Sequence, residues 1–91
     1  MKKSIDYKVE GGKLLRIEVE IENDIVKQIK ITGDFFIHPE EGILLIEKAI
    51  KGSSINEIAK KINEIVKNKN LLIIGFEGKD VQNAILNLIK C

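Results

Sequence analysis

The amino-acid sequence predicts an α+β fold in which a three-stranded antiparallel meander is followed by helices packed on one of its faces. Two patterns carry this prediction. In the first third of the chain apolar and polar residues alternate, which is the period of half-buried strands. From Pro39 onward the apolar residues instead recur at helical spacing. With 91 residues, no internal repeat and no low-complexity linker, the chain is expected to form one domain, residues 1–91.

A glycine pair joins the first two predicted strands. Apolar residues occupy alternate positions before the pair, in SIDYKVE, and after it, in LLRIEVEIE. Both sets share one face of the sheet if Val9 opposes Leu15, because residues two apart in a strand point to the same side. Tyr7 then opposes Ile17. We therefore expect a three-residue or bulged turn in which one glycine of the pair adopts a positive φ.

The third predicted strand follows an Asn-Asp turn. In IVKQIKITG, residues Ile25, Ile29 and Ile31 share one parity, and Lys27 is the mismatch. We expect Lys27 to lie at the margin of the sheet, where its long side chain reaches water. The strand, and with it the meander, is expected to end at Gly33.

Two helices are predicted after the meander. Pro39 suits the first position of a helix, and the two glutamates after it complement the helix dipole. Apolar residues at helical spacing continue this helix as far as Gly52. Ser54 and Glu57 have the spacing of a capping box, which opens a second helix running to about Lys67.

The last third of the chain contains an apolar run and a final amphipathic helix. The run Leu71 to Ile74 has the length of a short buried strand, but an extended linker has the same composition. Periodicity does not choose between the two, so both alternatives stay open. Apolar residues at helical spacing then predict a terminal helix: Val81, Ala84, Ile85, Leu88 and Ile89.

Composition and charge argue against several classes of function. The 15 basic and 14 acidic residues are interspersed along the chain, so no clustered positive face for nucleic acid is expected. No apolar run approaches the roughly 18 residues that span a bilayer, and the first residues do not resemble a signal peptide. We therefore expect a cytoplasmic protein that binds neither nucleic acid nor a membrane.

The sequence predicts no catalytic residue and no metal site. One histidine, His38, and one cysteine, Cys91, lie far apart, so neither a metal site nor an internal disulfide is expected. His38 is interpreted as the last residue of the loop before the first helix. The serines lack nucleophile motifs and the glycines lack phosphate-binding spacings. The glutamates of the second strand fit the wet face of an antiparallel sheet.

The segment ITGDFFIHPEEG concentrates the unusual residues of the chain. Phe35 and Phe36 are adjacent in an extended segment, so their side chains point to opposite faces and at most one joins the core. The other ring needs a second surface. One alternative is that both rings pack on helix ends; the other is an aromatic anchor for a partner protein. These residues alone leave both alternatives open.

The order of these motifs resembles a known family. VEGGKLLRIEVEIEND, followed by IKITGDFFIHPEE and KGSSINEIAKKI, is similar to the accessory, or C-terminal, domain of lipoate-protein ligases. In archaeal-type bipartite enzymes that domain is a separate small protein. The resemblance covers nearly the whole chain and is strongest from Gly11 to Glu41. GFEGKDVQNAI is similar to the end of that domain, which favours a linker followed by a helix. The resemblance also implies a fold similar to that of sulfur-acceptor and iron–sulfur scaffold proteins.

The resemblance implies an accessory subunit without catalysis of its own. In this family the large subunit binds ATP, magnesium and lipoate, forms lipoyl-adenylate and passes the lipoyl group to acyl-carrier domains. The small domain is needed for the adenylation step and is expected to bind no cofactor itself. Because Met1 lies almost directly before the first strand, we expect the catalytic subunit to be encoded separately and to form a heterodimer with this chain.

The partner is expected to bind at the glycine turn and at the segment after the third strand. The expected contact residues are Gly11, Gly12, Lys13, Asp34, Phe35, Phe36 and Pro39. Two alternative functions are kept. A sulfur-transfer or iron–sulfur assembly scaffold would need loop cysteines, and the sequence has only Cys91. A plain interaction module would bind a protein through an exposed strand edge.

Overall fold

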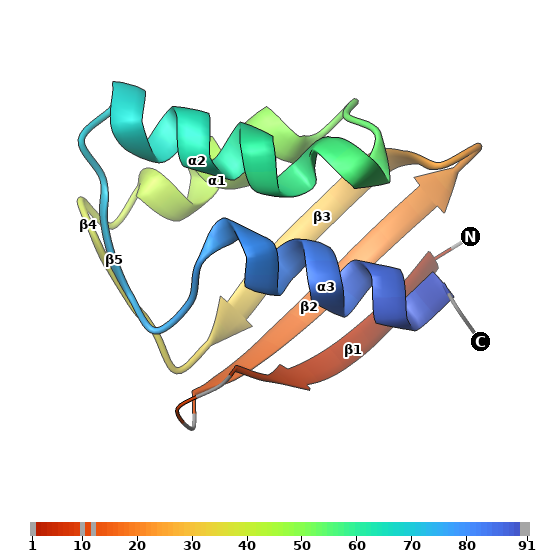
Figure 1. Cartoon of the computed structure of the whole chain (residues 1–91), viewed down its shortest axis with the longest axis horizontal. Coiled ribbons are helices and arrows are strands. Elements are labelled where there is room, and N and C mark those ends of the chain that lie inside the picture. Colours follow the sequence, from red (N-terminus) through yellow and green to blue (C-terminus); the bar gives the residue numbers. More distant parts are fainter. Residues whose placement is uncertain (1, 10, 12, 90–91) are drawn as a thin grey trace.

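A twisted three-stranded sheet with helices on one face forms the body of the molecule (Figure 1). The computed structural model describes residues 2–9, 11 and 13–89. Antiparallel strands lie in the order β1-β2-β3: β1 (Lys2–Lys8), β2 (Leu14–Glu22) and β3 (Ile25–Gly33). The helices that cover the sheet are α1 (Gly42–Ile50), α2 (Ile58–Asn68) and α3 (Gly78–Ile89). The predicted α+β class is confirmed.

A second sheet of two short strands lies at the end of the molecule opposite the termini (Figure 1). Strand β4 (Phe36–His38) pairs with β5 (Leu72–Ile74) in antiparallel orientation. Of the two alternatives kept for this apolar run, the short strand is confirmed and the linker, which the resemblance favours, is wrong, because Leu72–Ile74 pairs with Phe36–His38. His38 is correspondingly the last residue of a strand and does not end a loop.

The pairing of β1 with β2 differs by two residues from the predicted register. Tyr7 lies opposite Leu15, and Val9 instead closes the turn by donating its N–H to the carbonyl of Lys13 at 2.7 Å. The register differs from the predicted one by two residues, which is an even number. The same side chains of β1 and β2 therefore still share the apolar face. Gly11 has a φ of +102°, as expected for one glycine of the turn. Gly12 lies outside the described residues.

A β-bulge explains the mismatch in β3. Glu20 pairs with Gln28 but Ile21 pairs with Val26, so Lys27 is the extra residue of the bulge. The bulge reverses the parity of the strand at this point. Val26 is therefore fully buried and Lys27 exposed, whereas the sequence pattern had placed Ile25 on the core face. The Asn-Asp turn before β3 is confirmed by positive φ at both residues.

Both predicted helix starts differ in detail from the structure. Helix α1 begins at Gly42, because Pro39 lies in a preceding turn in which its carbonyl accepts the N–H of Gly42 at 2.9 Å. The hydroxyl of Ser54 caps a short 3-10 helix, Ile55–Glu57, by accepting the N–H of Asn56. The α-helix that follows ends at Asn68, close to the predicted end.

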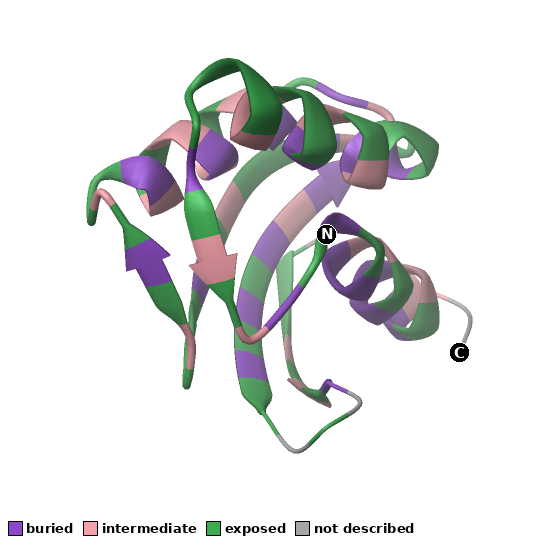
Figure 2. Cartoon of the chain, turned by 60° about the vertical axis from the view of Figure 1, so that its left-hand side comes forward, coloured by how far each residue is buried: buried purple, intermediate pink, exposed green. Residues whose placement is uncertain are grey.

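The core lies between the sheet and the helices. Buried residues alternate with exposed residues along β2, and the buried stripes of the helices face them (Figure 2). The largest fully buried side chains come from both layers: Leu15, Ile17, Val19, Val26, Ile46, Ile50, Ile58, Ile62, Val81 and Ile85. In the described part of the chain, no helix combines the length and the apolar character needed to cross a membrane.

Candidate functional site

The corner at Gly33 and Asp34 positions the candidate site. Here the chain leaves the large sheet and turns toward β4, and the N–H of Asp34 donates to the carbonyl of Leu14 at 3.0 Å. Gly33 has a φ of +144°, and a Cβ at this position would overlap the carbonyl oxygen of Leu14. Only glycine therefore allows the two strands to approach so closely at the corner.

The two phenylalanines after the corner point to opposite sides, as predicted. Phe35 is half-buried against the core, and its ring meets Phe76 edge-on, with 4.9 Å between centroids and 80° between planes. Phe36 is 55% exposed. The alternative in which both rings pack on helix ends is wrong for Phe36, because this ring lies on the outer side of the small sheet.

A depression beside the corner brings together most of the residues predicted to bind a partner. We call it the corner depression, and its lining residues are Lys13, Gly33, Asp34, Phe35, Phe36 and Ile74. Lys13 and Asp34 are exposed. Among the described residues, neither of these two side chains forms an ion pair or hydrogen bond. The corner depression therefore combines an apolar wall with charges of both signs that are free to meet another molecule.

The outer face of the β4–β5 ribbon adds two exposed apolar residues, Leu72 and Ile74, to the predicted contact residue Phe36. Phe36 lies opposite Ile74 and His38 opposite Leu72, and directly opposed residues of a sheet share a face. The three apolar residues among them, which we call the ribbon face, are each more than half exposed: Phe36, Leu72 and Ile74. A signal for it was present, since four consecutive apolar residues in a strand must leave two on each side.

Two of the remaining predicted contact residues, Gly11 and Pro39, do not line the corner depression. Gly11 belongs to the turn between β1 and β2, where a Cβ would meet nothing within 4 Å. Gly12 is outside the described residues. Pro39 is half-buried in the turn before α1, beyond the far end of β4. Both residues have a role in chain turns: Gly11 adopts a positive φ, and the carbonyl of Pro39 accepts a hydrogen bond in the turn before α1.

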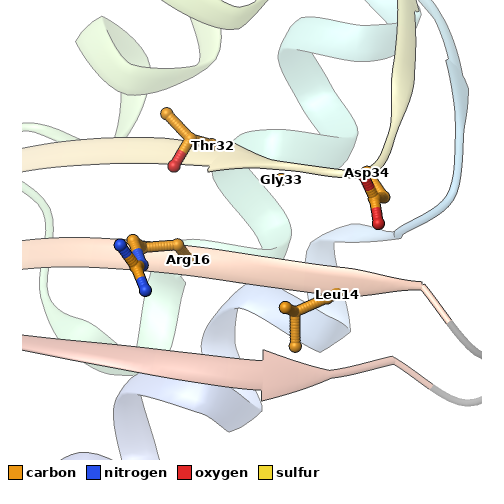
Figure 3. A pocket seen from close by; sticks show the side chains of 5 residues that line it. All are labelled: Leu14, Arg16, Thr32, Gly33 and Asp34. Carbon is orange, nitrogen blue, oxygen red and sulfur yellow. The ribbon is translucent and has the colours of Figure 1, made fainter.

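A second depression adjoins the first on the uncovered face of the large sheet (Figure 3). We call it the open-face depression, and its lining residues are Leu14, Arg16, Thr32, Gly33 and Asp34. Arg16 and Thr32 are cross-strand neighbours. The guanidinium of Arg16 donates to the carboxylate of Asp6 from Nε at 2.8 Å and from a terminal nitrogen at 3.2 Å. This bidentate contact holds the Arg16 side chain across the sheet.

We expect the Arg16–Asp6 ion pair to make a small, pH-dependent contribution to the free energy of unfolding. The hydrogen bond from Arg16 holds the pKa of Asp6 below its usual 3.8. The stabilisation is therefore present above pH 3.8 and is lost as the pH falls through the lower pKa of the folded state. We expect Asp6→Asn to lower the melting temperature slightly near pH 7, and the difference to vanish in strong acid. Thermal melts across this pH range, with Glu20→Gln as control, test it; a constant difference would contradict it.

The two depressions and the ribbon face have the features of a surface that binds another protein. In the part of the chain that the structure describes, no group of three His, Cys, Asp or Glu side chains is placed to hold a metal ion. Exposed apolar residues ringed by charged groups are typical of the centre and rim of a protein interface. Cys91, on which the sulfur-transfer alternative depends, lies outside the described residues.

Comparison with known proteins decides the family. No protein-family model matches this sequence. The chain is 34% identical over 85 residues to lipoate-protein ligase A subunit 2 of Thermoplasma acidophilum, and the match spans 90% of this chain and 85% of that protein. The chain belongs to the family of lipoate-protein ligase A subunit 2.

The fold agrees with a solved structure from the same family. A chain of the archaeal lipoylation system of Thermoplasma acidophilum, described as a bi-partite lipoate protein ligase and its E2 lipoyl domain, superposes with a TM-score of 0.78. It is 32% identical, and the match covers 92% of this chain and 93% of that chain. The resemblance noted from the motifs is confirmed, and the chain is an accessory subunit of the lipoate-protein ligase type. Family membership favours the ligase over the sulfur-transfer alternative.

Proposed function

We propose that this chain binds a separate catalytic lipoate-protein ligase subunit and enables the ATP-dependent adenylation of lipoate. The lipoyl group would then be passed to an acyl-carrier domain. The observation that carries the proposal is the match to a second ligase subunit along 90% of the chain. The related solved structure is of a ligase in two parts together with its E2 lipoyl domain, which supports the same arrangement here.

The surface of this chain supports a role in which it acts by binding to the catalytic subunit. The two adjoining depressions offer an apolar wall, unpaired charges and an anchored arginine. Such a surface supplies binding energy that can order loops of another protein, and loop ordering commonly completes an active site. We propose that ATP, magnesium and lipoate are held by the catalytic subunit and that this chain binds none of them.

The proposal predicts that adenylation depends on this chain. Adding it to the cognate catalytic subunit should raise lipoyl-adenylate formation roughly tenfold or more, the size of a typical coupling between sites, and the effect should saturate at equal amounts of the two proteins. Transfer from preformed lipoyl-adenylate should change little. The measurement is lipoate-dependent exchange of pyrophosphate into ATP.

Two controls make this test specific. The chain alone should show no exchange, and heat-unfolded chain should not stimulate the catalytic subunit. The two folded proteins should also elute together in gel filtration. If the catalytic subunit forms lipoyl-adenylate equally well without this chain, and the two proteins elute separately, the proposed function is wrong.

A further inference from the structure

We infer that the catalytic subunit docks on the ribbon face, with Phe36 as its central anchor. The identity of the partner rests on the proposed function. The structure adds where the partner binds and what it presents there. That partner surface is an apolar patch with an acidic group opposite Lys13 and a basic group opposite Asp34.

Folding does not explain the ribbon face. The inner side of the β4–β5 ribbon already supplies its packing through Ile37, which is 9% exposed, and through half-buried Ile73. The outer positions of an antiparallel sheet with one wet face are normally polar. Here three of the four paired outer positions are apolar, and each of the three is more than half exposed. Their composition fits an interface core better than a solvated surface.

The ribbon face is fixed in place before any partner arrives. Phe35 lies inward against Phe76, so the neighbouring Phe36 must point outward. On the other strand, Gly75 approaches Phe35 so closely that a Cβ would lie 2.9 Å from the Cβ of Phe35. Because the backbone under Phe36 is held by this packing, little backbone entropy is lost on binding, which favours affinity.

One positive and one negative side chain lie at the border of the ribbon face and can fix the orientation in which a partner docks. Lys13 and Asp34 line the corner depression together with Phe36 and Ile74, and neither charge is paired among the described residues. A partner that buries Phe36 brings its own surface close to both charges. Opposite charges at those two points would fix the orientation of docking, because charge complementarity contributes specificity.

The size of the surface favours a different protein over a second copy. Three half-exposed side chains present a few hundred Å², whereas a stable interface buries roughly 800 Å² on each partner. The open-face depression extends the surface, because it shares Gly33 and Asp34 with the corner depression. Figure 1 shows the β4–β5 ribbon and the end of β3, which carry these residues, at the same side of the molecule. A second copy that paired its own ribbon face with this one would bury only those few hundred Å² on each side.

The test compares equally exposed apolar residues inside and outside the ribbon face. Phe36→Ser and Ile74→Thr remove apolar contact at the proposed centre of the interface. Leu44→Ser is the matched control, since Leu44 is 63% exposed on α1 and belongs to neither depression. Affinity for the cognate catalytic subunit is measured by titration calorimetry, and circular dichroism checks that each variant is folded. Ile74→Thr keeps a β-branched residue in the strand and serves if Phe36→Ser does not fold.

We expect each ribbon-face variant to raise the Kd roughly tenfold or more and Leu44→Ser to change it less than about twofold. If the wild-type chain binds but folded ribbon-face variants bind equally well, or Leu44→Ser weakens binding as much, the inference is overturned and the proposed function stands. Failure of the wild-type chain to bind overturns both. A wild-type dimer that Phe36→Ser dissociates, and that the catalytic subunit does not compete with, overturns the inference in favour of a second copy.

Discussion

Replacing Gly33 with alanine is expected to lower the free energy of unfolding by at least about 3 kcal/mol, from positive φ and steric overlap together. The φ of +144° disfavours any side chain, and the new Cβ would overlap the carbonyl oxygen of Leu14. Neither strand yields easily, because that oxygen also accepts the N–H of Asp34 at 3.0 Å. The loss is a large part of the stability of a domain of this size.

Gly11→Ala separates the two causes of this loss. Gly11 also has a positive φ, +102°, but a Cβ there would meet nothing within 4 Å. We expect this control to lose only about 1 to 2 kcal/mol, the cost of the backbone conformation alone. Urea unfolding of both variants and the wild type measures the difference. Equal losses would show that the close approach of β2 to the corner does not matter for stability.

Local patterns predicted the large elements of this fold and the antiparallel meander, but they missed the exact register, the bulge and the second, smaller sheet. The helical stripe of residues 58–68 and the alternation in β2 are properties of single segments, and both were confirmed. The bulge at Lys27 is different, since it depends on how β3 meets β2. The pairing of β4 with β5 joins segments separated by two helices, and no local period reports such a contact.

The candidate site shows the same division. Asp34, Phe35 and Phe36 are predicted contacts because folding alone does not account for them, and Lys13 is added from the glycine turn. The structure brings all four together in one depression. Leu72 and Ile74 were missed because an apolar run was interpreted as buried or as a linker. They are exposed because β5 pairs with β4 and not with the large sheet, and they share the outer face of this pair with Phe36. The site is therefore a product of tertiary pairing. The apolar run alone indicates that two of its residues face each way, and the pairing with β4 places Leu72 and Ile74 on the face of Phe36.

Gly75→Ala is expected to destabilise the chain by about 2 to 4 kcal/mol, from the cost of a positive φ and of a close contact. Gly75 has a φ of +122°, and a Cβ would lie 2.9 Å from the Cβ of Phe35 and 3.1 Å from its Cα. To relieve the contact, the segment carrying Phe35 must move away from β5. This movement separates Phe36 from Ile74, so binding of the catalytic subunit should weaken together with stability.

Gly52→Ala is the matched control for this prediction, because Gly52 has a φ of +87° and space for a Cβ with nothing within 4 Å. It should lose roughly 1 kcal/mol and keep full affinity, since only its own backbone is strained. Urea unfolding and titration calorimetry on the same two proteins provide both readouts. A folded Gly75→Ala variant with unchanged affinity would show that partner binding does not depend on the spacing between Phe35 and β5. Weaker affinity in Gly75→Ala alone would link the tight packing under the ribbon to recognition on its outer face.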